Sequence, residues 1–122
     1  MKDSDLRTRA KAFALKIIAV CDTVDTKKGK GALVSQIVKS ATSIGANIHE
    51  ANYASSKADF INKFQIALKE CYETDYWLGL FKDTHMITTT EYDSLYGQCS
   101  KIRKLLISSI TTAKSNMEQK EK

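Results

Sequence analysis

The chain has 122 residues, of which 43% are hydrophobic and 27% charged, as expected for a single globular domain. It contains no proline and five glycines, and its net charge is +5. Because proline interrupts helices and turn-rich β folds depend on proline and glycine, this composition argues against a β architecture and favours long helices. The acidic start and the lack of an apolar stretch of about 18 residues predict a soluble, cytoplasmic chain without a signal peptide or membrane span.

The first half of the chain contains two apolar stripes with alternating steps of three and four residues, the spacing of helices packed in a bundle. The first stripe predicts a helix over about residues 4–25 and consists of Leu6, Ala10, Phe13, Ile17, Val20 and Val24. A loop rich in glycine and lysine follows. The second stripe predicts a helix over about 32–53 and consists of Leu33, Ile37, Ala41, Ile44, Ile48 and Ala51.

The second half contains two more stripes, each preceded by a helix-capping signal. Ser56 followed by Asp59 predicts the start of a helix over about 57–83, and Thr88 with Glu91 forms a capping-box pattern before a helix over about 89–115. The third stripe is Phe60, Phe64, Ala67, Cys71, Thr74, Leu78 and Phe81. The fourth is Tyr92, Leu95, Cys99, Ile102, Leu106, Ser109 and Ala113. Residues 116–122 lack this periodicity, and we expect them to fray.

Four helices of similar length joined by short loops predict an all-α fold, an up-down-up-down antiparallel four-helix bundle that forms one domain over residues 1–122. The three cysteines Cys21, Cys71 and Cys99 have no CxxC spacing. They predict small core side chains rather than disulfides or a zinc site.

The third helix carries apolar and aromatic residues that its own core does not explain. At about 100° per residue, Ile66, Tyr76, Trp77 and Leu80 lie roughly opposite the core stripe, around Lys69 and Glu73. Tyr and Trp are enriched at protein interfaces, so these residues and Glu73 predict a self-association surface. The alternative is that they are isolated surface side chains.

The second helix has a second seam beside its apolar stripe, made of small and polar residues. Its members are Gln36, Ser40, Ser43, Asn47 and Glu50. Two interpretations stay open for this seam: a solvated face, or a hydrogen-bonding surface against a neighbouring helix or subunit, to which Ser43, Asn47 and Glu50 would contribute. Gly45 within the same helix suggests a close approach of another helix.

The residues of these two helices resemble a known protein family. The motifs are Ser-x-x-Ser-Ile-x-x-Asn-Ile-x-Glu, from Ser40 to Glu50, and Glu-x-x-Glu-Thr-x-Tyr-Trp-Leu, from Glu70 to Leu78. They look like those of the four-helix-bundle proteins encoded in intervening sequences of bacterial 23S ribosomal RNA genes, with similarity over roughly residues 6–115. The chain departs from the pattern at Lys39, where the family often has arginine, and at His49, where it often has alanine.

The resemblance implies properties beyond the fold. The family is similar to the accessory protein of diversity-generating retroelements, a pentameric bundle that binds nucleic acid and a reverse transcriptase. The resemblance therefore implies a homopentamer and names RNA or DNA and another protein as candidate partners. The intervening-sequence branch itself has no settled activity, and both motifs are packing signatures rather than catalytic ones.

The sequence contains no arrangement of residues typical of an enzyme. Only two histidines are present, His49 and His85, and no Glu-x-x-His pair of the kind found in di-iron bundles occurs. Phosphate loops, dinucleotide-binding glycines and zinc motifs are also absent. We therefore expect a non-enzymatic protein without a metal or cofactor.

Positive charge is concentrated in the first and last helices, which can lie side by side in an antiparallel bundle. Residues 1–30 have an excess of four positive charges and residues 88–122 an excess of two. A basic surface that could bind phosphate backbones without sequence preference is predicted. Its members are Arg7, Arg9, Lys11, Lys27, Lys28, Lys30, Lys101, Arg103 and Lys104. The alternative is a solvated surface on a structural or protein-interaction module without a nucleic-acid role.

Overall fold

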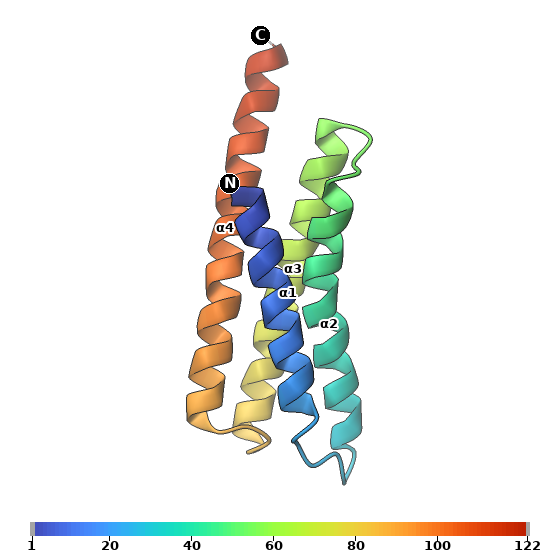
Figure 1. Cartoon of the computed structure of the whole chain (residues 1–122), viewed down its shortest axis with the longest axis vertical. Coiled ribbons are helices and arrows are strands. Elements are labelled where there is room, and N and C mark those ends of the chain that lie inside the picture. The colour runs from blue at the N-terminus through green and yellow to red at the C-terminus, as the bar shows by residue number, and fades with distance from the viewer. Residues whose placement is uncertain (1, 122) are drawn as a thin grey trace.

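The computed structural model describes the backbone of residues 2–121 and the side chains of residues 5–119, and it confirms the predicted all-α bundle. Four helices follow one another: α1 (Lys2–Cys21), α2 (Lys30–Ala51), α3 (Lys57–Asp83) and α4 (Thr89–Glu121). They run alternately down and up (Figure 1), with the 22–29 and 84–88 loops at one end and the 52–56 loop at the other. None of these helices is both long and apolar enough to cross a membrane, as far as the described residues go.

The helices form a square in which each one packs against two others. Contacts join α1 to α2, α2 to α3, α3 to α4 and α1 to α4, and no contact joins the diagonal pairs within the described part of the chain. The square therefore has four faces, each named here by the two helices that form it. This arrangement decides which surface residues of different helices become neighbours.

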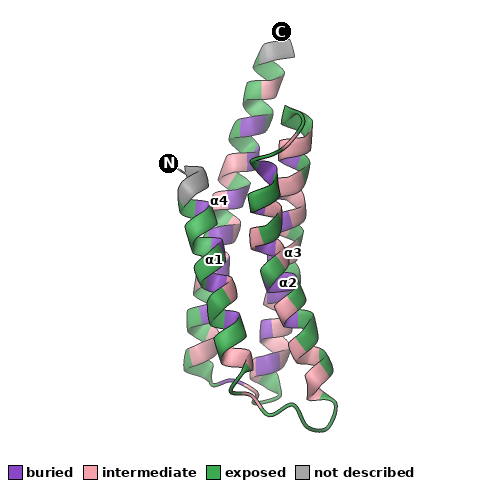
Figure 2. Cartoon of the chain, turned by 45° about the vertical axis from the view of Figure 1, so that its right-hand side comes forward, coloured by how far each residue is buried: buried purple, intermediate pink, exposed green. Residues whose placement is uncertain are grey.

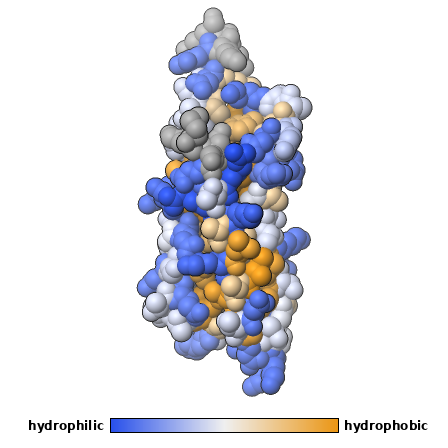
Figure 3. All heavy atoms as spheres, viewed as in Figure 1, coloured by the Kyte–Doolittle hydropathy of each residue, from blue (hydrophilic) through white to orange (hydrophobic). Residues whose placement is uncertain are grey.

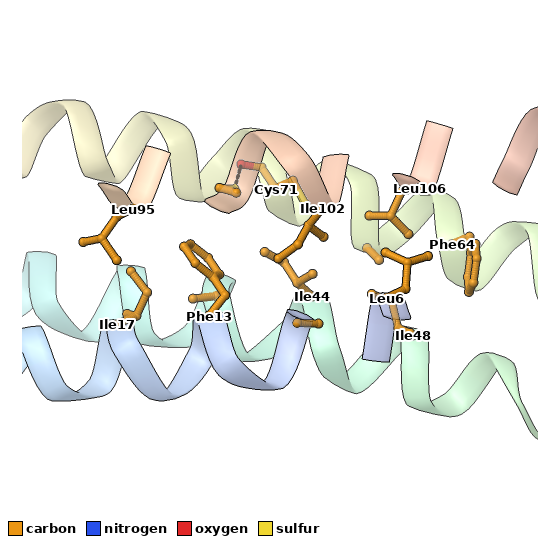
Figure 4. Packing of buried hydrophobic residues seen from close by; sticks show 14 of the residues in the cluster. Leu6, Phe13, Ile17, Ile44, Ile48, Phe64, Cys71, Leu95, Ile102 and Leu106 are labelled. Carbon is orange, nitrogen blue, oxygen red and sulfur yellow. Dashed lines mark hydrogen bonds between the residues drawn. The ribbon is translucent and has the colours of Figure 1, made fainter. Parts of the chain in front are cut away.

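The apolar stripes predicted from the sequence meet along the axis of the square (Figure 4). Large fully buried side chains come from every helix, including Phe13, Ile44, Phe64 and Ile102. Burial is concentrated on the inner side of each helix, and exposed residues cover the outer side (Figure 2). Cys71 and Cys99 are buried free thiols, and the Cys99 Sγ lies 3.6 Å from the Cys71 carbonyl oxygen.

Side-chain caps fix the starts of the last two helices. The Ser56 hydroxyl accepts a hydrogen bond from the Asp59 N–H (3.0 Å), as expected for the start of α3. The Thr88 hydroxyl accepts from the Glu91 N–H (3.0 Å) and the Glu91 carboxylate accepts from the Thr88 N–H (2.8 Å), which completes the capping box of α4.

The first loop begins earlier than the sequence suggests. The predicted helix 4–25 ends at Cys21, where the Thr23 hydroxyl donates to the Val20 carbonyl (2.7 Å) and begins a turn. The next helix starts at Lys30 and ends at Ala51, two residues before each predicted boundary. Gly29 precedes it with a φ of 83°, a left-handed conformation that glycine adopts without strain.

Residues 116–121, which we expected to fray, continue α4 as a helix to Glu121. This stretch lacks proline and glycine and is rich in helix-forming Met, Glu, Gln and Lys. Met117 also packs against the core cluster, so the helix retains one apolar anchor beyond the predicted end. Lys122 lies outside the described residues.

Candidate interaction surface

The residues predicted at a self-association surface come from two helices, and the fold brings them to one face of the square. The Thr74 hydroxyl of α3 donates to the Ser40 Oγ of α2 (2.8 Å), and Lys63 pairs with Glu50 (3.3 Å), which fixes the sides on which the helices meet. Residues at steps of three and four from these contacts share that side. They are Ser43 and Asn47 on α2, and Ile66, Glu70, Glu73, Trp77 and Leu80 on α3.

The apolar residues of this α2–α3 face are less exposed than the sequence suggested. Ile66, Trp77 and Leu80 are half-buried, and Trp77 packs against the core cluster, whereas Tyr76 is 62% exposed. The prediction that they point away from the core is wrong for Trp77, because it lies only about 60° from the core residue Thr74 around the helix. The Trp77 ring contacts Tyr76, with centroids 5.1 Å apart, and its Nε1 is buried without a hydrogen-bond partner among the described residues.

A shallow groove of about 400 Å³ on the same face is lined by Ile66, Lys69, Glu70 and Glu73. Burial raises the pKa of Glu70, and hydrogen bonding to Glu73 and the charge of Glu73 raise it further. Lys39 and Lys69 oppose this shift without cancelling it. Two adjacent carboxylates of this kind interact more favourably with an added positive charge than with each other.

The polar seam of α2 belongs partly to the bundle itself. Ser40 is buried and bonded to α3, so the neighbouring-helix interpretation holds at that position. The Asn47 amide donates to the Ser43 carbonyl within its own helix (2.8 Å), and both residues are half-buried. Gly45 faces α1, where a Cβ would lie 3.6 Å from the Ala10 Cβ, as expected for a close helix approach.

The residues predicted to form one basic surface are divided among several faces. Arg7 and Lys11 line a groove between α1 and α2, while Arg9 pairs with Asp5 on its own helix (3.0 Å). Lys101 and Lys104 are exposed on α4. At the far end of the bundle, Lys27 and Lys28 are exposed and Lys30 is half-buried.

Arg103 does not join this basic surface. It lies on the side of α4 that faces α3, whereas Lys101 lies on the other side of Ile102. It forms a salt bridge with Asp75, and its side chain is only 15% exposed. Its guanidinium lies 5.4 Å from the Tyr72 ring centroid and 5.7 Å from that of Tyr96. The grouping of Arg103 with the other basic residues is therefore corrected, since its charge is compensated within the bundle.

This Arg103 cluster on the α3–α4 face was missed in the sequence, although one signal was available. Asp75 and Arg103 each directly follow a core residue, Thr74 and Ile102, so each lies on the flank of its helix where a neighbour can reach it. Burial raises the pKa of Asp75 although Arg103 acts in the opposite direction. The two paired side chains are 28 residues apart in the sequence, so neither position by itself indicates its partner.

The described part of the chain brings no set of metal-ligating side chains together. No group of three or more His, Cys, Asp and Glu side chains there could hold a metal ion. The grooves are open surface features between helices. The α2–α3 face combines a groove, two adjacent carboxylates and the half-buried Trp77.

Comparison with known proteins agrees with the fold and with the two motifs. The sequence profile of the 23S rRNA-intervening sequence protein family matches residues 2–108. A crystal structure of a protein of unknown function from the S23 ribosomal protein family of Bacteroides thetaiotaomicron is 44% identical and superimposes with a TM-score of 0.86. The match covers 91% of this chain and 99% of that one. No curated protein matches. The chain therefore belongs to the family of 23S rRNA-intervening sequence proteins.

Proposed function

We propose that this protein is a non-enzymatic, self-associating four-helix module whose copies meet through the α2–α3 face. The observation that carries the proposal is the convergence on one face of two residue sets that lie outside the fully buried core. Ser43, Asn47 and Glu50 come from α2, and Ile66, Glu73, Trp77 and Leu80 come from α3. Half-buried apolar groups beside exposed Tyr76 are typical of a surface that loses its remaining exposure in an assembly.

The electrostatics of the face support the same proposal. Burial first, and then the neighbouring Glu73, raise the pKa of Glu70, so the isolated chain holds a partly desolvated carboxylate beside a second one at a cost. A positively charged group from another copy would relieve that repulsion. The resemblance favours a pentamer, and a second copy of the chain is therefore the first partner to test.

Light scattering coupled to size-exclusion chromatography tests this proposal. We expect the unmodified protein to elute as an oligomer at micromolar concentration and Tyr76→Glu to shift it to monomer, because the introduced charge would be buried in the contact. Tyr72→Glu is the matched control, since Tyr72 is 54% exposed on the same helix but its ring lies against Arg103 on the other flank. A monomeric unmodified protein would refute the proposal.

A second proposed activity is nucleic-acid binding by the basic residues that remain exposed on α1 and α4. Arg9, Lys101 and Lys104 belong to these two adjacent helices, and no acidic side chain of a neighbouring helix pairs with them among the described residues. Repetition of this surface in an oligomer would increase its field. The alternative is that the assembled protein binds only other proteins.

Mobility shifts with single-stranded RNA and duplex DNA separate these two alternatives. We expect micromolar or tighter binding near about 50 mM salt that weakens steeply as salt rises and has little base preference. Charge reversal at Lys101 and Lys104 should reduce binding to every sequence. The same change at Arg103 would place a second negative charge beside Asp75 and destabilise the bundle, so it does not report on binding alone. Absence of any binding at low salt would favour the protein-interaction alternative.

A further inference from the structure

We propose that the groove between α1 and α2 binds a nucleotide, whose phosphate group lies at the basic end of the groove. This inference goes beyond the proposed function, because the α1–α2 face is separate from the α2–α3 face. The groove encloses about 310 Å³, a volume within the range of small-ligand sites. Its floor includes Ala10 and Ala46, and its lining includes Arg7, Lys11 and His49.

The three basic side chains of the groove come from two helices and meet at one end. A Cβ at Gly45 of α2 would lie 3.6 Å from the Ala10 Cβ of α1, which fixes the relative height of the two antiparallel helices. Counting from this contact, Arg7 and His49 differ in height by one residue, or about 1.5 Å. Lys11 follows Arg7 by one helical turn and therefore lies on the same side of α1.

The positive charge of this end has no counter-ion among the described side chains. Asp5 and Glu50 are close to the basic groove residues in sequence, but they pair with Arg9 (3.0 Å) and Lys63 (3.3 Å) instead. The basic side chains of the groove are all exposed, so a ligand can reach them. This end of the groove therefore attracts an anion.

The donors at this end suit a phosphate group. A phosphate monoester carries a charge of about −1.5 to −2 and three strong acceptor oxygens. Arginine binds phosphate with two parallel hydrogen bonds, and lysine binds it as a point charge, so Arg7 and Lys11 supply complementary contacts. The His49 ring carries at least one N–H donor in either protonation state. A carboxylate has only two oxygens and one charge and would use fewer of these donors.

The apolar and aromatic groups beside this end suit a nucleotide base. The His49 ring lies beside the Tyr53 ring, with centroids 5.6 Å apart, and Tyr53 is 78% exposed. Bases stack on exposed aromatic side chains in many nucleic-acid-binding proteins. The small side chains of Ala10 and Ala46 leave the floor of the groove open. A ligand that joins a phosphate to a flat base therefore matches both parts of the site.

The distribution of surface polarity restricts the phosphate to one half of the molecule. Hydrophilic side chains gather on the half that contains the start of α1 and the end of α2, and an apolar patch covers the other half (Figure 3). In the second half of α1, Leu15 and Ile18 are 58% and 40% exposed and offer no hydrogen-bond donors. The phosphate therefore finds its partners only near Arg7 and Lys11.

Titration calorimetry with adenosine monophosphate tests the site. We expect this nucleotide to bind at least about tenfold more tightly than inorganic phosphate or adenosine, because only the nucleotide contacts both parts of the groove. Arg7→Gln and Lys11→Gln should each weaken its binding about tenfold. Lys16→Gln is the matched control and should change it less than about twofold, since Lys16 is an exposed lysine of α1 that lines the groove toward α4.

A second substitution tests the contact with the base separately from the contact with the phosphate. Tyr53→Ala should weaken binding of adenosine monophosphate about tenfold and leave the binding of inorganic phosphate unchanged. Because Tyr53 is 78% exposed, this variant should remain folded, which circular dichroism checks. Equal binding of the nucleotide by Tyr53→Ala and the unmodified protein would overturn the assignment of the base.

A nucleotide phosphate can come from a free nucleotide or from the 5′ end of an RNA strand, and a further comparison separates these sources. An RNA oligonucleotide with a 5′-phosphate should bind at least about tenfold more tightly than the same strand with a 5′-hydroxyl if strand ends enter the groove. The two strands should bind alike if only free nucleotides enter. The proposed site is overturned if neither adenosine monophosphate nor the 5′-phosphate is bound, or if Lys16→Gln weakens binding as much as Arg7→Gln and Lys11→Gln do.

Discussion

The two flanks of α3 both carry carboxylates, but they differ in which charges lie next to those carboxylates. On the α3–α4 flank, Arg103 forms a salt bridge with the Asp75 Oδ2 and lies against Tyr72 and Tyr96, while the Asp75 Oδ1 is buried without a hydrogen-bond partner among the described residues. On the α2–α3 flank, Glu70 lies next to Glu73 and the Trp77 Nε1 has no partner among the described residues. The difference between the flanks is therefore one of charge: the carboxylate of one flank faces an opposite charge within the bundle, whereas the two carboxylates of the other flank lie beside each other.

The comparison predicts that the largest loss of stability comes from the compensated flank. Arg103→Met should lower the free energy of unfolding by about 2–4 kcal/mol, because the Asp75 carboxylate, only 17% exposed, loses its counter-ion. Lys104→Met is the matched control and should change it by less than about 0.5 kcal/mol, since Lys104 is exposed. Urea denaturation at neutral pH measures both.

The pH dependence of Arg103→Met separates the loss of charge compensation from a loss of packing. Burial raises the pKa of Asp75, and removal of Arg103 should raise it further. The unpaired charge costs stability only while Asp75 is ionised, so the deficit relative to the unmodified protein should shrink as pH falls through that pKa. A deficit that is equal at neutral and mildly acidic pH would instead indicate lost packing.

A smaller loss of stability is expected for a substitution where the α2–α3 flank borders the core. Thr74→Val removes the hydroxyl that donates to Ser40 (2.8 Å) and leaves that buried oxygen with fewer partners. The expected cost is about 1–2 kcal/mol, because Ser40 keeps its own bond to the Ile37 carbonyl (3.2 Å). Thermal denaturation compares this variant with Thr42→Val, at an exposed position of α2. Equal stability of Thr74→Val and the unmodified protein would contradict the role assigned to this bond.

The smallest expected change in the free energy of unfolding is an increase rather than a decrease. Glu70→Gln removes the repulsion from Glu73 and should stabilise the isolated chain by about 0.5 kcal/mol or less at neutral pH. Because the folded-state pKa of Glu70 is raised, its contribution to stability is full at acidic pH and is lost as pH rises through that pKa, so the gain should disappear in acid. Melts on the monomeric Tyr76→Glu background exclude any contribution from assembly. A destabilising effect at neutral pH would mean that the Glu70 charge is already compensated.

The sequence by itself determined the fold. Periodic stripes such as Leu6, Ala10, Phe13 and Ile17 specify the buried side of each helix, and the caps at Ser56 and Thr88 specify where two helices begin. These signals are local, so spacing within one helix is sufficient to detect them. The two motifs of α2 and α3 similarly sufficed to indicate the family.

Only the tertiary structure decided which surface residues became neighbours. Arg103 and Lys101 look equivalent in sequence, yet one pairs with α3 and the other stays exposed, because they lie on opposite flanks of Ile102. The seam of α2 and the apolar residues of α3 were each detected, but their union on one face depends on the Ser40–Thr74 contact between helices. Side-chain direction around a helix is fixed by the local period, whereas the neighbour that it meets is fixed by the packing of the whole core.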